Sequence, residues 1–277
     1  MSTGARWSAR DAHPVGPPTV SEHRVDLEDA DGVRLIAFDR PEVRNAFDLA
    51  MYRAVTEALL AAAADPSIGA VVLTGRGSVF TAGQDLREMA ALAQGTADPE
   101  AGTGFPALLD ALQSFPKPLL AAVHGVGMGL GFTMLAHVDL VLLDETARLR
   151  APFAEMGVPP EAASSLLLPE RMGWQRASLA LLASAWVDAT QALEAGLAVE
   201  VVPEGTVLEA TMALARRIAS FPTRATQEIK RLMVAAHRDG IAAARAREEA
   251  AFAALFADPA TNPGSGLASG LPGGLRD

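Results

Sequence analysis

Two glycine-containing turns are the stretches of this sequence in which backbone groups could bind an oxyanion. The first follows the apolar run 71–73 and leads through Gly83 to a helical pattern; the second follows the run 118–123 and leads through Gly129 and Gly131. Such apolar, β-branched runs favour buried strands. A helix start leaves backbone N–H groups unpaired, so each turn could bind an anion or a carbonyl oxygen that gains charge. Together they predict a two-donor oxyanion hole, although each alone also fits ordinary turn geometry or close helix packing.

Carboxylates near these turns are the candidates for acid–base catalysis. Asp85 stands where a helix N-cap is expected and is interpreted as a cap rather than a base. Glu161 follows Pro159-Pro160 and is interpreted from its position as an acid in the first turn of a helix. There the helix dipole would lower its pKa, whereas burial would raise it. Glu155 is a rival carboxylate in a predicted loop.

Strands, turns and helices alternate through the first part of the chain. The predicted hairpin has strands 22–27 and 33–38 around Asp31-Gly32. The pattern then predicts a helix from Asp48 to Ala64, a helix at 87–92, a flexible loop at 93–103, a helix at 107–114, a helix at 132–137 and a strand at 139–143. Beyond Glu161 the chain is mainly helical, with capping pairs Asp188–Gln191 and Thr206–Glu209 and helices at 223–237 and 241–256. These elements predict an α/β fold.

Composition excludes several classes of function. The 277 residues are 50% hydrophobic, carry a net charge of −10 and include no cysteine. An acidic chain without a basic cluster is a poor nucleic-acid binder, and no apolar run is long enough to cross a membrane. Without cysteine there is no disulfide framework and no thiolate metal site, which fits a cytoplasmic location. His124 and His137 are assigned to packing or hydrogen bonding, because no partner has metal-ligand spacing, so no metal is expected.

Three motifs in order resemble the crotonase superfamily of enoyl-CoA hydratases and isomerases. They are RPEVRNAFD at 40–48, VFTAGQDL at 79–86 and AAVHGVGMGLGF at 121–132, and the resemblance runs from about residue 25 to about residue 256. It implies a stacked ββα superhelix with a C-terminal helical region that covers the active site. The expected organisation is a flexible arm at 1–19, a crotonase core at 20–200, a helical region at 201–257 and a disordered tail at 258–277. The tail lacks the family's usual ending, so a contribution from it to the CoA site is not expected.

The resemblance implies which backbone groups form the oxyanion hole. One donor is the N–H of Gln84, after Ala82-Gly83, and the other is the N–H of Leu130, between two glycines. A leucine is compatible because only its N–H is used. Both donors would bind the thioester oxygen of an acyl-CoA as it gains negative charge.

The acid–base residues separate the possible reactions. In the hydratases of this family two glutamates are needed, and the matching positions here are Thr133 and Phe153. Hydration requires a bound water and a proton donor, tasks that suit paired carboxylates. Thr133 and Phe153 are therefore assigned to packing or to the pocket wall. The segment 151–173 resembles instead the peroxisomal-type Δ3,Δ2-enoyl-CoA isomerases, in which the matching acid is Glu161. One base suffices to move a proton from C2 to C4.

The resemblance also implies contacts with the CoA part of the substrate. Arg44 precedes Asn45-Ala46, where relatives keep a basic residue near the CoA phosphates, although a solvated surface arginine fits equally well. Lys230 is a second candidate for phosphate binding. The remaining expected substrate-binding positions are Ala46, Ala82, Gly83, Asp85 and Gly129.

The preferred function is isomerisation of a 3-enoyl-CoA to a 2-enoyl-CoA, with coenzyme A as part of the substrate and no separate cofactor. One alternative is another reaction of the superfamily, such as hydration by a water on Glu161 alone. A second alternative, of a different class, is a CoA-thioester binding protein without catalysis. The family implies a homotrimer or a homohexamer, and no nucleic-acid or membrane partner is expected.

Overall fold

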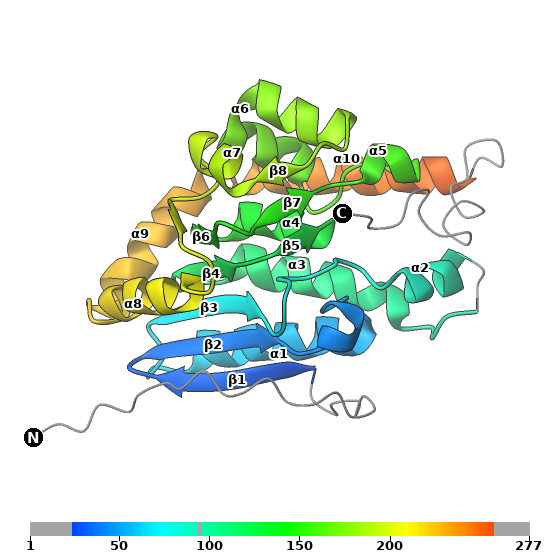
Figure 1. Ribbon diagram of the computed structural model, residues 1–277. Coiled ribbons are helices and arrows are strands. Elements are labelled where there is room, and N and C mark those ends of the chain that lie inside the picture. The colour runs from blue at the N-terminus through cyan, green and yellow to red at the C-terminus, as the bar shows by residue number, and fades with distance from the viewer. Residues whose placement is uncertain (1–23, 94–95, 258–277) are drawn as a thin grey trace, which may run out of the picture.

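The computed structural model describes residues 24–93 and 96–257. The predicted arm at 1–19 and tail at 258–277 lie outside the described residues, as does the start of the first predicted strand. The described chain has a mixed α/β fold, as expected, in which a six-stranded sheet is covered by helices on both faces (Figure 1).

The main sheet grows from the predicted hairpin. Its strands, in spatial order, are β1 (Val25–Ala30), β2 (Val33–Phe38), β3 (Ala70–Gly75), β4 (Leu119–Val123), β6 (Leu140–Asp144) and β9 (Glu200–Val202). Asp31 and Gly32, both with positive φ, turn β1 back antiparallel onto β2, whereas the other neighbours are parallel. Because helices cover both faces, β3 and β4 are buried at every position and read as continuous apolar runs.

A small second sheet lies beside the carboxyl ends of the central strands. It consists of β5 (Val126–Met128), β7 (Arg148–Arg150) and β8 (Val187–Asp188). The second glycine turn is thus partly a strand, which the sequence pattern did not predict. The reason is local: β5 pairs with β7 along its full length, and Gly127 accommodates a close approach by Leu149 and Gly131 that a Cβ would block.

Helices pack on both faces of the main sheet and around its carboxyl end (Figure 1). They are α1 (Leu49–Ala64), α2 (Leu86–Ala93), α3 (Gly104–Ser114), α4 (Leu130–Thr133), α5 (Phe153–Met156), α6 (Ser164–Leu182), α7 (Ala189–Glu194), α8 (Val207–Ala219), α9 (Thr223–Ala235) and α10 (Arg238–Ala257). The 3-10 turns are η1 (Pro41–Val43), η2 (Ala101–Thr103) and η3 (Met134–His137). One core lies between the sheet and α1, α3 and α6, and a smaller core lies under α8 on the opposite face.

Of the capping interactions predicted for α1, α7 and α8, two are confirmed and one is wrong. Asp48 caps α1 by accepting from Met51 N, and Asp188 with Gln191 forms a complete capping box at α7. Thr206 precedes α8, but its hydroxyl donates to the Pro203 carbonyl at 2.7 Å and makes no cap.

The predicted boundary between residues 200 and 201 falls inside β9. Within the described ranges, no helix has the length and apolarity to span a bilayer.

Candidate active site

The two glycine turns lie against each other at the carboxyl ends of β3 and β4. Thr81 pairs with β5: its N–H donates to Val126 O at 3.1 Å, and its carbonyl accepts from Met128 N at 3.0 Å. Gly83 has φ +82°, and a Cβ there would lie 2.4 Å from the Met128 carbonyl oxygen and 3.4 Å from Leu130 N. Only glycine therefore fits where the first turn touches the start of α4.

The hydrogen bonds around these turns leave the two predicted donors unused. Phe47 pairs across Gln84, because Phe47 N donates to Gly83 O and Asp85 N donates to Phe47 O. This parallel bridge uses the Gly83 carbonyl and the Asp85 N–H, on either side of Gln84, and leaves the N–H of Gln84 itself unused. Leu130 is the first residue of α4, so its N–H has no partner within the helix. Among the residues that the structure describes, neither N–H donates to a protein acceptor.

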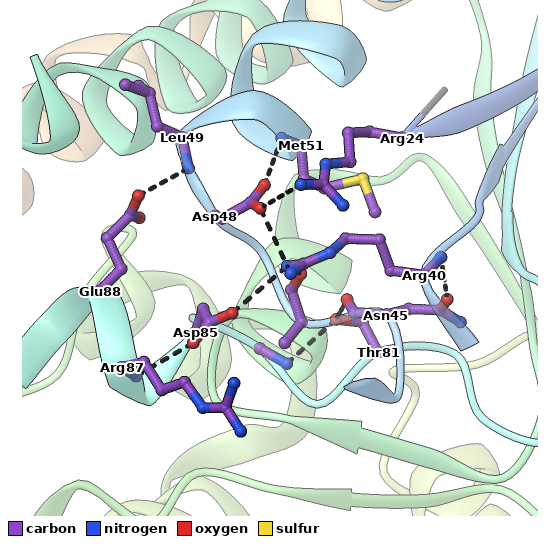
Figure 2. Close-up of polar contacts among 12 residues, drawn as sticks. Arg24, Arg40, Asn45, Asp48, Leu49, Met51, Thr81, Asp85, Arg87 and Glu88 are labelled. Carbon is purple, nitrogen blue, oxygen red and sulfur yellow. Dashed lines mark hydrogen bonds and ion pairs between the residues drawn. The ribbon is translucent and has the colours of Figure 1, made fainter. Parts of the chain in front are cut away.

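A buried polar network holds the first turn in place (Figure 2). The Asn45 side chain donates to the carbonyls of Arg76, Val79 and Phe80, and its carbonyl Oδ1 accepts from Arg40 N. The Thr81 hydroxyl donates to Asn45 O at 2.6 Å and accepts from Gly83 N at 3.0 Å. These contacts satisfy the N–H next to Gln84 and fix the direction of the turn.

Arg40 connects this turn to the start of α1. Its guanidinium lies 3.3 Å from Asp48 Oδ2 and 3.4 Å from Asp85 Oδ2, and also donates to Ala46 O (Figure 2). Asp85 accepts from Arg87 N at 3.0 Å, as expected of an N-cap of α2. The Ala46 carbonyl and the Asp85 carboxylate face Arg40, and neither of these two expected substrate contacts lines the cavity beside the turns.

A cavity of about 520 Å³ is lined by Gln84 and Leu130, the two residues whose N–H groups are unused. Of the residues singled out in the sequence, Ala82, Gln84, Gly129, Leu130, Phe153 and Glu161 line it. Most of the remaining wall is apolar and comes from α2, α3 and α10, including Met89, Phe105, Leu109 and Phe252. The two donors and the candidate base thus share one apolar cavity, with a volume in the usual range of small-molecule sites.

Glu161 lies in a turn before α6 rather than in the first turn of that helix. The helix begins at Ser164, and Ala162 and Ala163 between them have φ values of 60° and 56°. This corrects the expectation that the helix dipole acts directly on Glu161. Burial dominates instead and raises the pKa of Glu161 to about 7, with a smaller contribution in the same direction from the charge of Glu248.

Glu248 is a residue of the cavity wall that sequence reasoning missed. It lies in α10, is buried, and lines the same cavity as Glu161. Its Oε2 accepts from Ala163 N at 2.7 Å and its Oε1 accepts from Ser165 N at 2.9 Å. A signal existed: Ile241, Ala244 and Glu248 repeat at helical spacing, so a glutamate stands on the inward face of an amphipathic helix.

The other candidate acid–base positions are Phe153, Thr133 and Glu155. Phe153 lines the cavity, as expected of a pocket residue. Thr133 is fully buried, its Oγ1 has no hydrogen-bond partner among the described residues, and it does not line the cavity, so it packs inside α4 instead. Glu155 forms an ion pair with Arg150, is exposed and lies outside the cavity wall.

Lys230 does not present its ammonium to a ligand. Its Nζ donates to Lys117 O at 2.9 Å and to Asp139 Oδ2 at 2.6 Å, and lies over the Phe115 ring. The residue is buried and burial lowers its pKa, so the contacts are those of an internal ion pair. These contacts do not support its expected role in phosphate binding, which stays a prediction. Arg44 is exposed and lies outside the cavity wall, and a phosphate contact from it stays a prediction.

The two histidines have hydrogen-bonding roles. His124 Nε2 pairs with Gly77 O, and His137 Nε2 pairs with Ala162 O at 2.7 Å. Burial lowers the pKa of His137 to about 4, so it is neutral near pH 7 and donates that bond. Within residues 24–93 and 96–257, no three or more His, Asp or Glu side chains are grouped so as to hold a metal ion.

Comparisons with known proteins agree with the motifs and the fold. The enoyl-CoA hydratase/isomerase family model matches residues 28–267. The chain is 35% identical to the 2,3-dehydroadipyl-CoA hydratase of Escherichia coli (strain K12), covering 81% of this chain and 87% of that protein. It is 31% identical to the enoyl-CoA delta isomerase 2 of Homo sapiens, covering 79% of this chain but 56% of that longer protein.

Solved structures of enoyl-CoA hydratase/isomerase proteins have the same fold as this chain. A crystal structure of an enoyl-CoA hydratase/isomerase from Pseudoalteromonas atlantica T6c superposes with a TM-score of 0.81 at 33% identity, covering 88% of this chain and 95% of the other. The OdaA protein of Pseudomonas aeruginosa also superposes with a TM-score of 0.81, at 34% identity over 90% of this chain and 98% of the other. The chain therefore belongs to the enoyl-CoA hydratase/isomerase family of the crotonase superfamily, whose enzymes act on acyl-CoA substrates.

Proposed function

We propose that this enzyme moves the double bond of an enoyl-CoA thioester from C3 to C2, with Glu161 as its single acid–base group. The observation that carries the proposal is a partly buried carboxylate, with a pKa raised to about 7, on the wall of the cavity that Gln84 and Leu130 also line. Neither backbone N–H has a protein acceptor among the described residues. A base and two unpaired donors are the groups that proton transfer next to a thioester requires.

The reaction divides into two proton transfers. Glu161 removes a proton from C2, and the electron pair left behind spreads over the C3–C4 double bond and the thioester carbonyl as a dienolate. The Gln84 and Leu130 N–H groups donate to the thioester oxygen, which carries most of the new charge. Protonated Glu161 then delivers its proton to C4, which leaves the double bond between C2 and C3 and regenerates the carboxylate.

The properties of Glu161 suit both halves of this cycle. A proton carrier works best when its pKa lies near the working pH, because it must accept and release the same proton. With a pKa of about 7, Glu161 is substantially ionised at neutral pH and returns its proton readily. The base contributes about 10²–10⁴-fold, and each oxyanion donor contributes about 3–4 kcal/mol.

Replacement of the base tests the proposal. Glu161→Gln keeps the side-chain volume and removes the proton acceptor, so isomerisation of a 3-enoyl-CoA should fall by about 10²-fold or more while acyl-CoA binding survives. Glu155→Gln is the matched control, because Glu155 is an exposed glutamate of the same segment outside the cavity. Thr133→Ala should likewise cost far less than the loss of the base. Full isomerase activity in Glu161→Gln would remove Glu161 from the mechanism.

Hydration of a 2-enoyl-CoA is the second candidate function. One observation favours it: Glu248 brings a second carboxylate to the cavity wall, although not at either position that the resemblance to hydratases implies. Both oxygens of Glu248 already accept backbone N–H groups, which leaves them poorly placed to hold and deprotonate a water. Hydration should therefore be slow or absent. If the enzyme hydrates a 2-enoyl-CoA as fast as it isomerises a 3-enoyl-CoA, hydration would replace isomerisation as the preferred function.

No separate cofactor is proposed. The chemistry needs no group besides the CoA moiety of the substrate, because both proton transfers use Glu161. A cytoplasmic location stays a prediction from the cysteine-free composition.

We further propose assembly into a trimer or a dimer of trimers. The support is a set of exposed apolar side chains on α6 and α9: Trp174, Leu179, Leu182, Leu232 and Met233. Exposed apolar surface of this extent commonly marks an interface between chains.

A further inference from the structure

The turn that carries Glu161 has a strained backbone. Ala162 and Ala163 both adopt positive φ, a conformation that costs a non-glycine residue roughly 1–2 kcal/mol. Both methyl groups are buried, so the turn cannot relax outward. Strained conformations persist only where surrounding contacts hold them. The contacts around this turn therefore decide where the Glu161 carboxylate lies.

Glu248 provides the contacts that the local sequence lacks. The N-cap of α6 is Ala163, whose methyl group cannot accept a hydrogen bond. The two carboxylate oxygens of Glu248 accept instead from the N–H groups of Ala163 and Ser165, at 2.7 and 2.9 Å. A side chain 85 residues away in the sequence thus does the work of a capping residue. On the other side of the turn, His137 pairs with the carbonyl of Ala162.

This arrangement also explains why the start of α6 does not lower the pKa of Glu161. The N–H groups that would favour a negative charge there are occupied by Glu248, so Glu161 experiences a neighbouring anion instead of free donors. The other titratable or charged groups near this end of the cavity are Tyr52 from α1, His137 from η3, and Arg245 and Glu249 from α10. Arg245 is paired with Asp110 at 2.6 Å.

We propose that Glu248 is a positioning residue, which holds the strained turn that carries Glu161 and fastens the C-terminal helix α10 to the reacting end of the cavity. The inference rests on the proposed function, in which Glu161 is the base. It adds a second role for α10, which also contributes Phe252 and Phe256 to the cavity wall. The helix that lines the cavity thereby also sets the position and the proton affinity of the base.

The test compares Glu248→Gln with the wild-type enzyme. The amide has one acceptor oxygen in place of two and carries no charge, so one backbone N–H loses its partner and the anion beside Glu161 disappears. We expect kcat for isomerisation to fall by about 10–100-fold, as for other small misplacements of a catalytic group, while affinity for acyl-CoA is kept. Glu228→Gln is the control, because Glu228 is an exposed residue of α9 that lies outside the cavity wall, so the change removes one negative charge there.

A titration shows whether Glu248 also affects the proton affinity of Glu161. The Glu161 carboxyl can be followed by ¹³C NMR in protein labelled at the glutamate carboxyl carbon, with its signal identified by its absence in Glu161→Gln. The wild-type signal should titrate near pH 7, and in Glu248→Gln it should titrate at lower pH, because a like charge has been removed. Glu228→Gln should leave it unchanged. A wild-type titration or a wild-type kcat in Glu248→Gln would overturn the proposal.

Amide exchange in the wild-type enzyme provides a test that needs no variant to fold. The N–H groups of Ala163 and Ser165 should exchange slowly with solvent, because each donates to a buried carboxylate. Exchange at the rate of an exposed loop would refute the contact and the inference with it. Neither this measurement nor the titration requires turnover. If Glu161 proves not to be the base, the exchange and titration measurements still decide whether Glu248 holds the turn that carries Glu161.

Discussion

The burial of Glu161 should make the stability of this enzyme depend on pH in a way that one substitution removes. The pKa of Glu161 is raised from 4.5 to about 7, mainly by burial, so the folded state binds the Glu161 proton more tightly than the unfolded state does. Between those two pKa values the folded state holds more protons, and its free energy of unfolding falls as pH rises. Above about pH 7 the full cost of the buried charge is present.

The size of the effect follows from the two pKa values. Integrated from pH 5.5 to pH 8, the Glu161 proton accounts for about 2 kcal/mol of lost stability. Glu161→Gln has a neutral side chain of nearly the same volume at every pH. Its free energy of unfolding, relative to that of wild type, should therefore increase by about 2 kcal/mol over this interval.

Urea unfolding of both proteins at several pH values measures this difference. Protein concentration must be equal throughout, because any assembly would add its own contribution to stability. Other titrating groups cancel in the comparison, and Glu155→Gln, which changes an exposed glutamate, should show no such trend. A difference that does not vary with pH would mean that Glu161 ionises like an exposed carboxylate, and the account of its burial would fail.

Three further predictions concern the turn, the internal ion pair and assembly. Gly83→Ala should lower kcat by about 10²-fold or more, because the new Cβ would meet the Met128 carbonyl at 2.4 Å and displace the neighbouring N–H donor; near-normal kinetics would refute that packing. Lys230→Met should cost about 2–3 kcal/mol in urea unfolding by leaving Asp139 without its charged partner, with acyl-CoA affinity unchanged. Weaker binding at unchanged stability would support Lys230 as a phosphate ligand. Light scattering at micromolar concentrations should report a trimer or a hexamer, and a monomer alone would contradict the proposed interface.

Much of the fold, and the importance of the two glycine turns, could be predicted because local signals indicate them. Buried parallel strands appear as continuous apolar runs, as at β3 and β4. Asp48 and Asp188 cap their own helices through contacts three residues away, which sequence spacing reveals. Gly83 is required by a positive φ and a close backbone approach. A glycine between a strand pattern and a helix pattern can be recognised in the sequence as the residue of such a turn.

The remaining features depend on contacts between distant parts of the chain. Lys230 carries the same charge whether it meets a phosphate or Asp139, and only the packing of α9 against the core decides. Thr206 has a capping residue's identity, but its hydroxyl finds the Pro203 carbonyl instead. Glu248 acts on a turn 83–85 residues away. Its sequence signal, a carboxylate on the inward face of a helix, indicates burial but not the partner.

A crystal structure with an unreactive acyl-CoA bound would locate the thioester oxygen and C2 relative to the proposed catalytic groups. The thioester oxygen should lie about 2.7–3.1 Å from both Gln84 N and Leu130 N. The Glu161 carboxylate should face C2, within reach of the proton that it removes. A thioester oxygen bound away from these two N–H groups, or a different side chain facing C2 with Glu161 turned away, would contradict the proposed mechanism.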